Sequence, residues 1–487
     1  MRASVQFLLN GEPVRIDPGP GSPWCPTTTV LQFLRHHPEH RGVKEGCAEG
    51  DCGACTVVLA DEDANGALRY RAVDSCLLFV PSLDRKHLIT IEGLRSGNGA
   101  LHPVQDAIIR HAGSQCGFCT PGIVMSLFAL YHTEGVIDRL SVVDALAGNL
   151  CRCTGYRPVV DAGLEACGTH GDDHFASREP GVLAQLRTIP AEDLHFEYDG
   201  QSYHRPASLD GALRYRAEHP EALIINGATD VALRVTKRHE HLDAVLDLSG
   251  VPELRTVHTS ASGIEIGAGT TIEELRRATM ERIPALAAML TVFGSRQIRN
   301  VATLGGNLGT GSPIGDTLPV LLALGATITV AGPHGRRPIP IGEFFTGYRR
   351  TACGPDELIV SVQIPFCGPD TLVRSFKVSR RRDMDISSVS AGFRLRLAPD
   401  GSVADVVLAY GGMAATPRRA TRTEEFLSGK PWARGTVEYA MDVLATDFTP
   451  LSDVRGSAEF RMVIARNLLL KFWSGSTAAT AATEVRP

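Results

Sequence analysis

Cysteine carries the most chemistry in this chain of 487 residues, because eight of its 12 cysteines fall into two groups before residue 155. Clustered cysteines in a reducing compartment are more typical of metal ligands than of disulfides. The first group is Cys47, Cys52, Cys55 and Cys76, and the second is Cys116, Cys119, Cys151 and Cys153. Each group can therefore supply four thiolates to one metal site.

The spacing of the first group is the more specific signal. Cys47-x4-Cys52-x2-Cys55, followed by Cys76, matches the plant-type ferredoxin loop, which binds a [2Fe–2S] cluster through four thiolates. Such a cluster is negatively charged, so its loop must direct backbone N–H groups inward, and glycines allow that bend. A zinc knuckle is the alternative. The long first gap favours iron–sulfur, as do the interleaved glycines Gly46, Gly50 and Gly53.

The second group joins two distant pairs. Cys116-x2-Cys119 precedes a helix expected from Pro121, and Cys151-x-Cys153 follows another expected helix. Folding a helical bundle would bring the pairs together. A zinc site with four cysteine ligands fits this ligand count as well as iron does, so the residues alone leave the metal open.

The elements that position these cysteines differ between the two groups. Residues 1–92 contain short β-rich runs and one short amphipathic helix, which predict a small α+β domain. Residues 93–167 predict a bundle of about four short helices, with Pro103 and Pro121 in first turns and a capping box at Ser141-x-x-Asp144. Residues 168–187 lose periodicity and predict an exposed linker.

The rest of the chain predicts α/β structure with two glycine-containing stretches. Residues 224–231 (IINGATDV) run from a strand into a turn, which alone is weak evidence of nucleotide binding. Residues 300–316 combine Gly, Ser, Thr and Asn, which offer many donors with little bulk and suit a pyrophosphate. Between them, Thr271 and Glu274 form a capping box before a predicted helix.

Composition excludes several classes of function. The formal net charge of −5 is not that of a nucleic-acid-binding surface. The N-terminal apolar run breaks at Asn10-Gly11, before a secretory signal could be completed, and no apolar run approaches the roughly 18 residues of a membrane span. We therefore expect a cytoplasmic protein with no nucleic-acid or membrane partner.

Three cysteine-containing stretches resemble the molybdenum hydroxylases, the xanthine oxidase and dehydrogenase family. They are residues 43–57 (VKEGCAEGDCGACTV), 115–125 (QCGFCTPGIVM) and 148–158 (GNLCRCTGYRP). The resemblance implies two [2Fe–2S] clusters and decides against zinc in the second group. It also implies that Gln115 contacts a molybdopterin held by a partner. Ala48 replaces a glycine usual in the family, which is tolerable if its φ is negative.

The same resemblance implies a multidomain α+β fold. The expected order is a β-grasp ferredoxin-like domain (1–92), a four-helix [2Fe–2S] domain (93–167) and a linker (168–187). An α+β FAD-binding domain of the vanillyl-alcohol-oxidase/PCMH type (188–367), a C-terminal α+β flavoprotein domain (368–475) and a disordered tail (476–487) follow.

The resemblance also implies FAD contacts. Residues 224–231 would wrap the pyrophosphate, Phe293 would lie beside the flavin ring, and others would add polar or weaker contacts. The expected FAD residues are Ile224, Ile225, Asn226, Gly227, Ala228, Thr229, Asp230, Val231, Phe293, Thr303, Gly306, Asn307, Asp316, Ile359 and Lys377.

The function implied is electron transfer in the small iron–sulfur/FAD subunit of a bacterial-type xanthine dehydrogenase. The chain ends after the flavoprotein part, so we expect the molybdopterin and all catalytic residues on a large partner subunit, in an α2β2 heterotetramer. Electrons from the oxidation of hypoxanthine or xanthine to urate would pass through the second cluster, the first cluster and FAD to NAD+. Alternatives are an aldehyde or N-heteroaromatic dehydrogenase, a molybdenum-free NAD(P)H/ferredoxin-type module, or a scaffold.

The remaining reactive residues have weaker patterns. The stretch 380–382 (RRR) is either a solvated turn or a site for pyridine-nucleotide phosphates. The only H-x-x-H, at His37 and His40, lies in a polar stretch and does not predict a further metal site. We expect structural thiols at Cys25, Cys167, Cys353 and Cys367.

Overall fold

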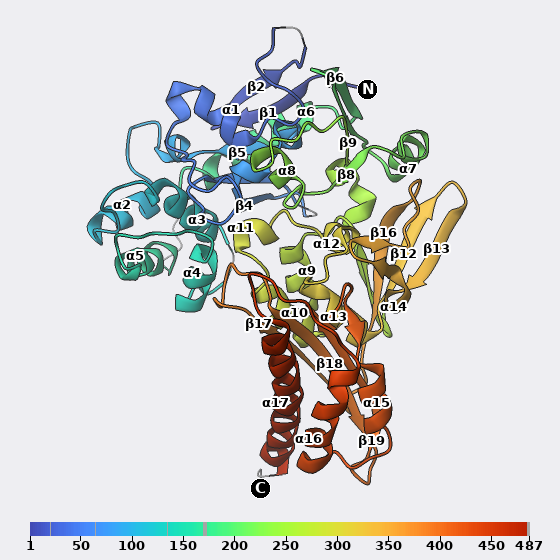
Figure 1. Cartoon of the computed structure of the whole chain (residues 1–487). Coiled ribbons are helices and arrows are strands. Elements are labelled where there is room, and N and C mark those ends of the chain that lie inside the picture. Colours follow the sequence, from blue (N-terminus) through green and yellow to red (C-terminus); the bar gives the residue numbers. More distant parts are fainter. Residues whose placement is uncertain (20, 64, 134, 169–172, 485–487) are drawn as a thin grey trace. The chain divides into compact units, whose positions relative to one another are not determined.

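A computed structural model of the chain describes residues 1–19, 21–63, 65–133, 135–168 and 173–484 (Figure 1). The chain divides into two compact units, and each is described by itself. Unit 1 comprises Met1–Pro252 and Gly294–Ala302, and unit 2 comprises Glu253–Phe293 and Thr303–Pro487. The predicted multidomain α+β class is confirmed. The domain boundaries stay a prediction, and residues of the predicted FAD domain fall in both units.

The first part of unit 1 is a sheet in the order β2-β1-β5-β3-β4. Asn10 (φ 53°) and Gly11 (φ 93°) form the β1–β2 turn, because two successive positive φ angles suit a tight hairpin. Helix α1 begins with a capping box between Thr29 and Gln32. The elements are β1 (Val5–Leu9), β2 (Glu12–Ile16), α1 (Val30–His36), η1 (Pro38–His40), β3 (Thr56–Glu62), β4 (Leu68–Asp74), η2 (Ser75–Leu77), η3 (Val80–Leu83), β5 (His87–Ile89) and η4 (Ile91–Leu94).

Helices α2 (Pro103–Arg110), α3 (Thr120–Tyr131), α4 (Arg139–Leu146) and α5 (Arg157–Gly168) follow. Helix α3 is apolar and almost wholly buried, so it forms the centre of this bundle. Pro103 and Pro121 lie in first turns, as predicted. The predicted capping box at Ser141 is wrong. Asp138 caps α4 and accepts the Ser141 N–H at 2.8 Å, because its carboxylate competes for the same early donors.

The predicted irregular linker is wrong over part of its length. Residues 169–172 lie outside the described residues, but η5 (Ala176–Arg178) and α6 (Glu179–Thr188) are helical. Phe175 and Leu186 are buried in the same core as α3. Val182 and Leu183 of α6 also pack against this core, so apolar side chains at helical spacing dock the segment.

The last part of unit 1 is a sheet in the order β6-β7-β9-β8, in which β9 pairs in parallel with both neighbours. Its side chains share a core with the first sheet, including Tyr203 and Phe7. The elements are β6 (Leu194–Tyr198), β7 (Gln201–Arg205), α7 (Leu209–Glu218), β8 (Leu223–Ile225), α8 (Ala232–Thr236), β9 (Ala244–Asp247), η6 (Leu248–Gly250) and, from the returning segment, α11 (Arg296–Arg299).

Unit 2 begins with a sheet in the order β10-β11-β16-β12-β13. The predicted capping box between Thr271 and Glu274 is confirmed at the start of α9. The elements are η7 (Pro252–Arg255, whose first residue belongs to unit 1), β10 (Val257–Thr259), β11 (Gly263–Gly267), α9 (Ile272–Thr279), α10 (Pro284–Thr291), α12 (Leu304–Thr310), α13 (Thr317–Leu324), β12 (Thr327–Gly332), β13 (Gly335–Pro340), α14 (Ile341–Phe344), β14 (Phe345–Gly347), β15 (Arg350–Thr351) and β16 (Leu358–Pro365).

The C-terminal part of unit 2 is an antiparallel sheet in the order β17-β18-β19-β20, with α17 against it (Figure 1). Its core includes Phe393, Tyr410 and Phe472. Helix α17 extends to Glu484, through an Ala-rich stretch of high helix propensity within the predicted tail. The elements are β17 (Thr371–Val378), β18 (Val389–Leu397), β19 (Val403–Gly411), β20 (Arg418–Arg419), α15 (Thr421–Leu427), α16 (Arg434–Val443), η8 (Leu444–Thr446) and α17 (Ala458–Glu484).

Among the described residues, no helix is both long enough and apolar enough to cross a membrane.

Candidate functional site

The first cysteine loop directs backbone donors at sulfur. The N–H groups of Glu49 and Asp51 donate to Cys47 Sγ at 3.4 and 3.3 Å. The Cys52 thiol also bonds to Cys47, and together these donors lower the pKa of Cys47 to about 5. Donors that stabilise a thiolate here are the feature expected of an iron–sulfur loop.

Positive backbone angles produce that inward bend. Gly50 (φ 77°) and Gly53 (φ 65°) are glycines, but Ala48 has a φ of 55°. The condition under which alanine would be tolerable at this position, a negative φ, is therefore not met. The loop needs the left-handed region at this point, and a non-glycine residue pays a steric cost there.

The other two cysteines of the first group lie deeper. Cys55 and Cys76 are buried. The hydrogen bond between these two thiols, and then burial, raises the pKa of Cys55 well above its usual value. Asp74 is a neighbour that the sequence analysis missed. Burial and then the nearby Cys47 raise its carboxyl pKa to about 8. The first group thus consists of an outer pair, Cys47 and Cys52, and an inner pair, Cys55 and Cys76.

The second group is arranged in the same two-pair way. Cys116 and Cys153 are exposed free thiols, and the hydrogen bond between them raises the pKa of Cys153. The Cys119 side chain forms a hydrogen bond with the buried Cys151. Burial raises the pKa of Cys151, but the Thr154 hydroxyl 3.1 Å away and other donors outweigh it and leave that pKa lowered. Two pairs of thiols fit a cluster in which each of two irons takes two thiolates.

The two cysteine loops touch directly. The Leu150 N–H donates to the Cys52 carbonyl at 2.9 Å, and Leu150 precedes Cys151. On the other side of the second group, Gln115 is exposed together with Cys116 and Cys153. The second group therefore has one edge against the first group and one edge at the surface of this chain.

The first predicted FAD stretch forms a strand and a sharp turn in unit 1. Strand β8 ends at Ile225, and Gly227 (φ 90°) and Ala228 (φ 58°) reverse the chain. A Cβ at Gly227 would lie 1.8 Å from the Val301 carbonyl oxygen, so only glycine fits. Asn226 and Thr229 are half-buried and Asp230 is exposed, which leaves polar groups of the turn accessible.

The other predicted FAD residues belong to unit 2. Thr303 caps α12 by accepting the Gly306 N–H at 3.1 Å, and Gly306 itself is exposed. Asn307, on the same helix, accepts the Thr317 hydroxyl. Ile359 lies against α12, where a Cβ at Gly309 would meet it at 3.7 Å. The half-buried Phe293 follows the end of α10.

Two of the predicted FAD residues form an ion pair. Lys377 Nζ lies 2.7 Å from Asp316 Oδ2 and donates to the Val292 carbonyl at 2.9 Å. Ser387, which the sequence analysis missed, donates to Asp316 Oδ1. The pair is nearly buried, so each charge is held in one position.

Protein-family models match the chain in four consecutive stretches. Residues 23–80 match a 2Fe-2S iron-sulfur cluster binding domain, and residues 90–164 match a [2Fe-2S] binding domain. Residues 194–367 match the FAD binding domain in molybdopterin dehydrogenase, and residues 374–476 match the CO dehydrogenase flavoprotein C-terminal domain. The chain belongs to the molybdenum hydroxylase family. It contains the iron–sulfur and FAD domains of that family.

Relatives of this molybdenum hydroxylase chain include two named xanthine dehydrogenase. The protein from Oryza sativa subsp. japonica is 33% identical over 91% of this chain, and that from Drosophila pseudoobscura pseudoobscura is 35% identical over 96%. The chain spans only 38% and 39% of the lengths of these two relatives.

Solved structures of other molybdenum hydroxylases resemble the fold. A carbon monoxide dehydrogenase from Hydrogenophaga pseudoflava has a TM-score of 0.53 and 27% identity, covering 55% of this chain and 93% of that one. Quinoline 2-oxidoreductase from Pseudomonas putida 86 has a TM-score of 0.52 and 26% identity, covering 57% of this chain and 99% of that one.

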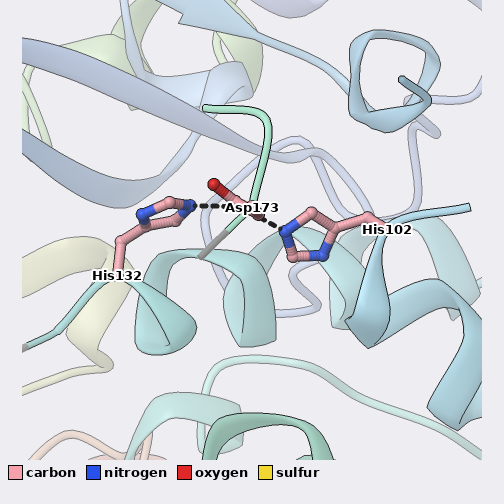
Figure 2. Close-up of side chains that lie close together, drawn as sticks. All are labelled: His102, His132 and Asp173. Carbon is pink, nitrogen blue, oxygen red and sulfur yellow. Dashed lines mark hydrogen bonds and ion pairs between the residues drawn. The ribbon is translucent and has the colours of Figure 1, made fainter. Parts of the chain in front are cut away.

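A second polar cluster in unit 1 escaped the sequence analysis. Asp173 lies between His102 and His132, with Oδ2 at 2.7 Å from His102 Nε2 and 3.1 Å from His132 Nε2 (Figure 2). The three side chains are almost fully buried. Burial raises the pKa of Asp173, but the bonds from both imidazoles outweigh burial and hold that pKa well below its usual range.

The hydrogen bonds of His102 favour a structural pin over a metal site. The three ligand atoms lie within 4.8 Å of one another, as a metal would require. However, His102 Nδ1 accepts the Val104 N–H at 3.2 Å at the start of α2. A neutral imidazole that accepts at Nδ1 carries its proton at Nε2, where it donates to Asp173 and cannot bind a metal.

Replacing Ala48 by glycine is expected to stabilise the first cysteine loop. Glycine relieves about 1 kcal/mol of left-handed strain, partly offset by about 0.5 kcal/mol of extra freedom in the unfolded chain. The Tm of the Ala48→Gly variant should therefore rise slightly. Ala54→Gly is the matched control, because Ala54 is buried in the same loop without a positive φ. It should lower the Tm, and equal losses in both variants would contradict the strain assignment.

Cysteine variants should separate the two metal sites. Cys116→Ser or Cys153→Ser is expected to remove one of two distinguishable [2Fe–2S] EPR signals and retain FAD, because each cluster needs all four thiolates. Cys76→Ser should remove the other signal. The control is Cys25→Ser, at a half-buried thiol that contacts Thr28. Retention of both signals in the Cys116 or Cys153 variant would reject the ligand assignment.

Asp173→Asn should destabilise the protein most at neutral pH, by about 2 kcal/mol for hydrogen bonds to a charged group. The folded-state pKa of Asp173 is depressed, so its contribution is full above about pH 4 and is lost as pH falls further. The Tm gap to the unmodified protein should thus narrow in acid. The control Asp161→Asn removes only exposed ion pairs on α5 and should change little. A Tm raised by added Zn²⁺ would contradict the pin.

Proposed function

We propose that this chain transfers electrons from a molybdopterin site on a partner chain to NAD+, as part of a xanthine dehydrogenase that converts hypoxanthine and xanthine to urate. The observation that carries the proposal is the direct contact between the two cysteine loops through Leu150 and Cys52. A pair of adjoining metal sites in the same unit is an arrangement for passing electrons, whereas isolated structural metals need no such contact.

The chain's own residues divide the task. When bound, the [2Fe–2S] clusters carry single electrons and FAD exchanges these for the two-electron reduction of NAD+. The N–H groups of Glu49 and Asp51 stabilise charge at Cys47. Gln115, exposed beside Cys116 and Cys153, would contact the partner's pterin. In this proposal the partner covers the exposed edge of the second group.

The residues proposed to hold FAD fit it in each unit. The turn at Gly227 is too close to Val301 for any side chain, so its backbone would face the ligand, and Asn226 and Thr229 beside it are only half-buried. In unit 2, the exposed Gly306 and the half-buried Asn307 offer main-chain and amide donors with little bulk.

The site of NAD+ has weaker support. The guanidinium groups of Arg380 and Arg381 donate to the main-chain carbonyls of Val454 and Met384, each at 2.6 Å. These bonds hold the turn, and a pyridine-nucleotide phosphate would have to share the same cations.

Another substrate is the alternative within the family. The similarity to a carbon monoxide dehydrogenase and to quinoline 2-oxidoreductase favours keeping aldehyde or N-heteroaromatic oxidation as a second candidate. In either case substrate choice would depend on the partner chain.

Turnover of the purified native complex tests the proposal. Xanthine and NAD+ should bleach the flavin and then form NADH, in a preparation that contains a molybdenum-bearing partner chain. Turnover with an aldehyde or quinoline but not with xanthine would select the alternative. Purification of the active chain without molybdenum would overturn both.

Asp316→Ala should lower the FAD content while both iron–sulfur EPR signals persist. Removing this carboxylate leaves Lys377 as a buried unpaired cation, at a cost of about 3 kcal/mol. The control Asp405→Ala breaks the more exposed pair with Arg394 in the same unit and should retain FAD. Unchanged flavin content in the Asp316 variant would reject its assignment.

A further inference from the structure

A buried amide joins the two cysteine loops. Asn149 Nδ2 donates to the Gly53 carbonyl at 3.0 Å and to Thr56 Oγ1 at 3.1 Å. Gly53 lies between Cys52 and Cys55, and Asn149 lies two residues before Cys151. Asn149 is only 2% exposed, so water does not compete for these bonds. The Asn149 side chain therefore fastens one metal-binding loop to the other.

Gln297 holds the other side of this amide. Its Nε2 donates to Asn149 Oδ1 at 2.9 Å, to Ser126 Oγ at 2.8 Å and to the Ala145 carbonyl at 3.2 Å. The Ser126 hydroxyl also donates to Asn149 Oδ1 at 2.6 Å. Asn149 Oδ1 thus accepts two hydrogen bonds, which fix the direction in which its Nδ2 points.

Gln297 lies in a short segment, residues 294–302, that belongs to unit 1, although its neighbours in sequence belong to unit 2. Besides Gln297, this segment pairs Arg299 with Asp144 at 2.7 Å. Asn300 forms two hydrogen bonds with β4. Its Nδ2 donates to the Ala72 carbonyl at 2.8 Å, and its main-chain carbonyl accepts from the Arg71 guanidinium at 3.0 Å. The segment therefore contacts both the first sheet and the helical bundle.

Three glycines allow the parts to approach so closely. A Cβ at Gly53 would lie 2.2 Å from the Gly148 carbonyl oxygen, and a Cβ at Gly122 would lie 2.2 Å from the Gly53 carbonyl oxygen. A Cβ at Gly148 would lie 2.4 Å from Gln297 Oε1. Any side chain at these positions would push the loops apart, so the spacing is fixed by contact as well as by hydrogen bonds.

We propose that Asn149 and Gln297 are positioning residues that set the spacing and electronic coupling between the two metal sites. The inference rests on the proposed two-cluster electron transfer. Electronic coupling falls steeply with distance and falls less steeply through covalent and hydrogen bonds than through gaps. The bond from the Leu150 N–H to the Cys52 carbonyl offers such a path. The Asn149–Gln297 clamp holds that bond in register.

The experiment measures the spin–spin interaction between the two reduced clusters in the full, cofactor-loaded chain. At low temperature this interaction splits both [2Fe–2S] EPR signals when both clusters are reduced. Gln297→Ala should weaken the splitting, and Asn149→Ala, which also removes the hydrogen bond to the Gly53 carbonyl, should weaken it further. Both signals should persist, because no cysteine is altered.

The matched control is Gln201→Ala. Gln201 is another buried glutamine of unit 1, at 3% exposure against 0% for Gln297, and its amide bonds to Thr27 and to the Leu242 carbonyl. Both glutamine variants lose buried side-chain hydrogen bonds, so both should lower the Tm. Only Gln297→Ala should alter the EPR splitting. This contrast separates a positioning role from a general loss of stability.

The outcomes distinguish the inference from the proposed function. Weaker splitting in Gln297→Ala than in Gln201→Ala supports the clamp, even if Asn149→Ala does not fold. Unmodified splitting in both Gln297→Ala and Asn149→Ala overturns it. An unmodified chain without two [2Fe–2S] signals overturns the proposed function, and the inference with it.

Discussion

The close approach of two cysteine-bearing loops at Gly53 is the constraint on which the metal-binding part of unit 1 depends. The Gly53 carbonyl accepts the Asn149 amide, the Thr56 N–H and the Thr56 hydroxyl, and it lies against Gly122 and Gly148. Each lost partner weakens this contact, because buried hydrogen-bonding groups are costly to leave without their bonds. The first sheet, the helical bundle and the segment carrying α11 are therefore held in one arrangement.

Charge is distributed unevenly over the cysteine groups. Donors around Cys47 favour its thiolate, whereas burial and the Cys76 thiol raise the pKa of Cys55. The carboxyl pKa of Asp74, beside them, is raised to about 8, first because burial disfavours its charged form and then because Cys47 lies nearby. In the second group the directions are reversed, because the pKa of the exposed Cys153 is raised and that of the buried Cys151 is lowered. Each site thus combines a solvated edge with a deeper edge in a low-dielectric interior.

Unit 2 uses a buried ion pair to hold polar residues near α12 and α13. Asp316 lies just before α13, Lys377 comes from β17, and Ser387 comes from the loop before β18. Lys377 also reaches the carbonyl of Val292, next to Phe293. The pair links three parts of the chain far apart in sequence. Its charges are nearly buried, so one substitution would leave an uncompensated ion.

Local pattern allowed much of the fold to be predicted. Pro103, Pro121 and the Thr271–Glu274 box marked helix starts correctly because these signals act within one turn. The predicted cap of α4 at Ser141 was wrong because Asp138 caps the helix and accepts the Ser141 N–H. Helix α6 was predicted as an irregular linker because its docking depends on a core that is distant in sequence, which Phe175 and Leu186 join. Ala48 has a positive φ because the shape of the loop outweighs the backbone preference of alanine, and sequence could state this only as a condition.

The sequence by itself determined the chemistry of this protein, because cysteine spacing and glycine density reflect what a cluster loop requires locally. It also carried the motifs that place the chain among the molybdenum hydroxylases. Only the tertiary structure decided how the thiols pair, how Asp173 pins His102 and His132, and how Gln297 meets Asn149. These contacts join residues far apart in the chain. Their partners are selected by packing geometry, which no local pattern records.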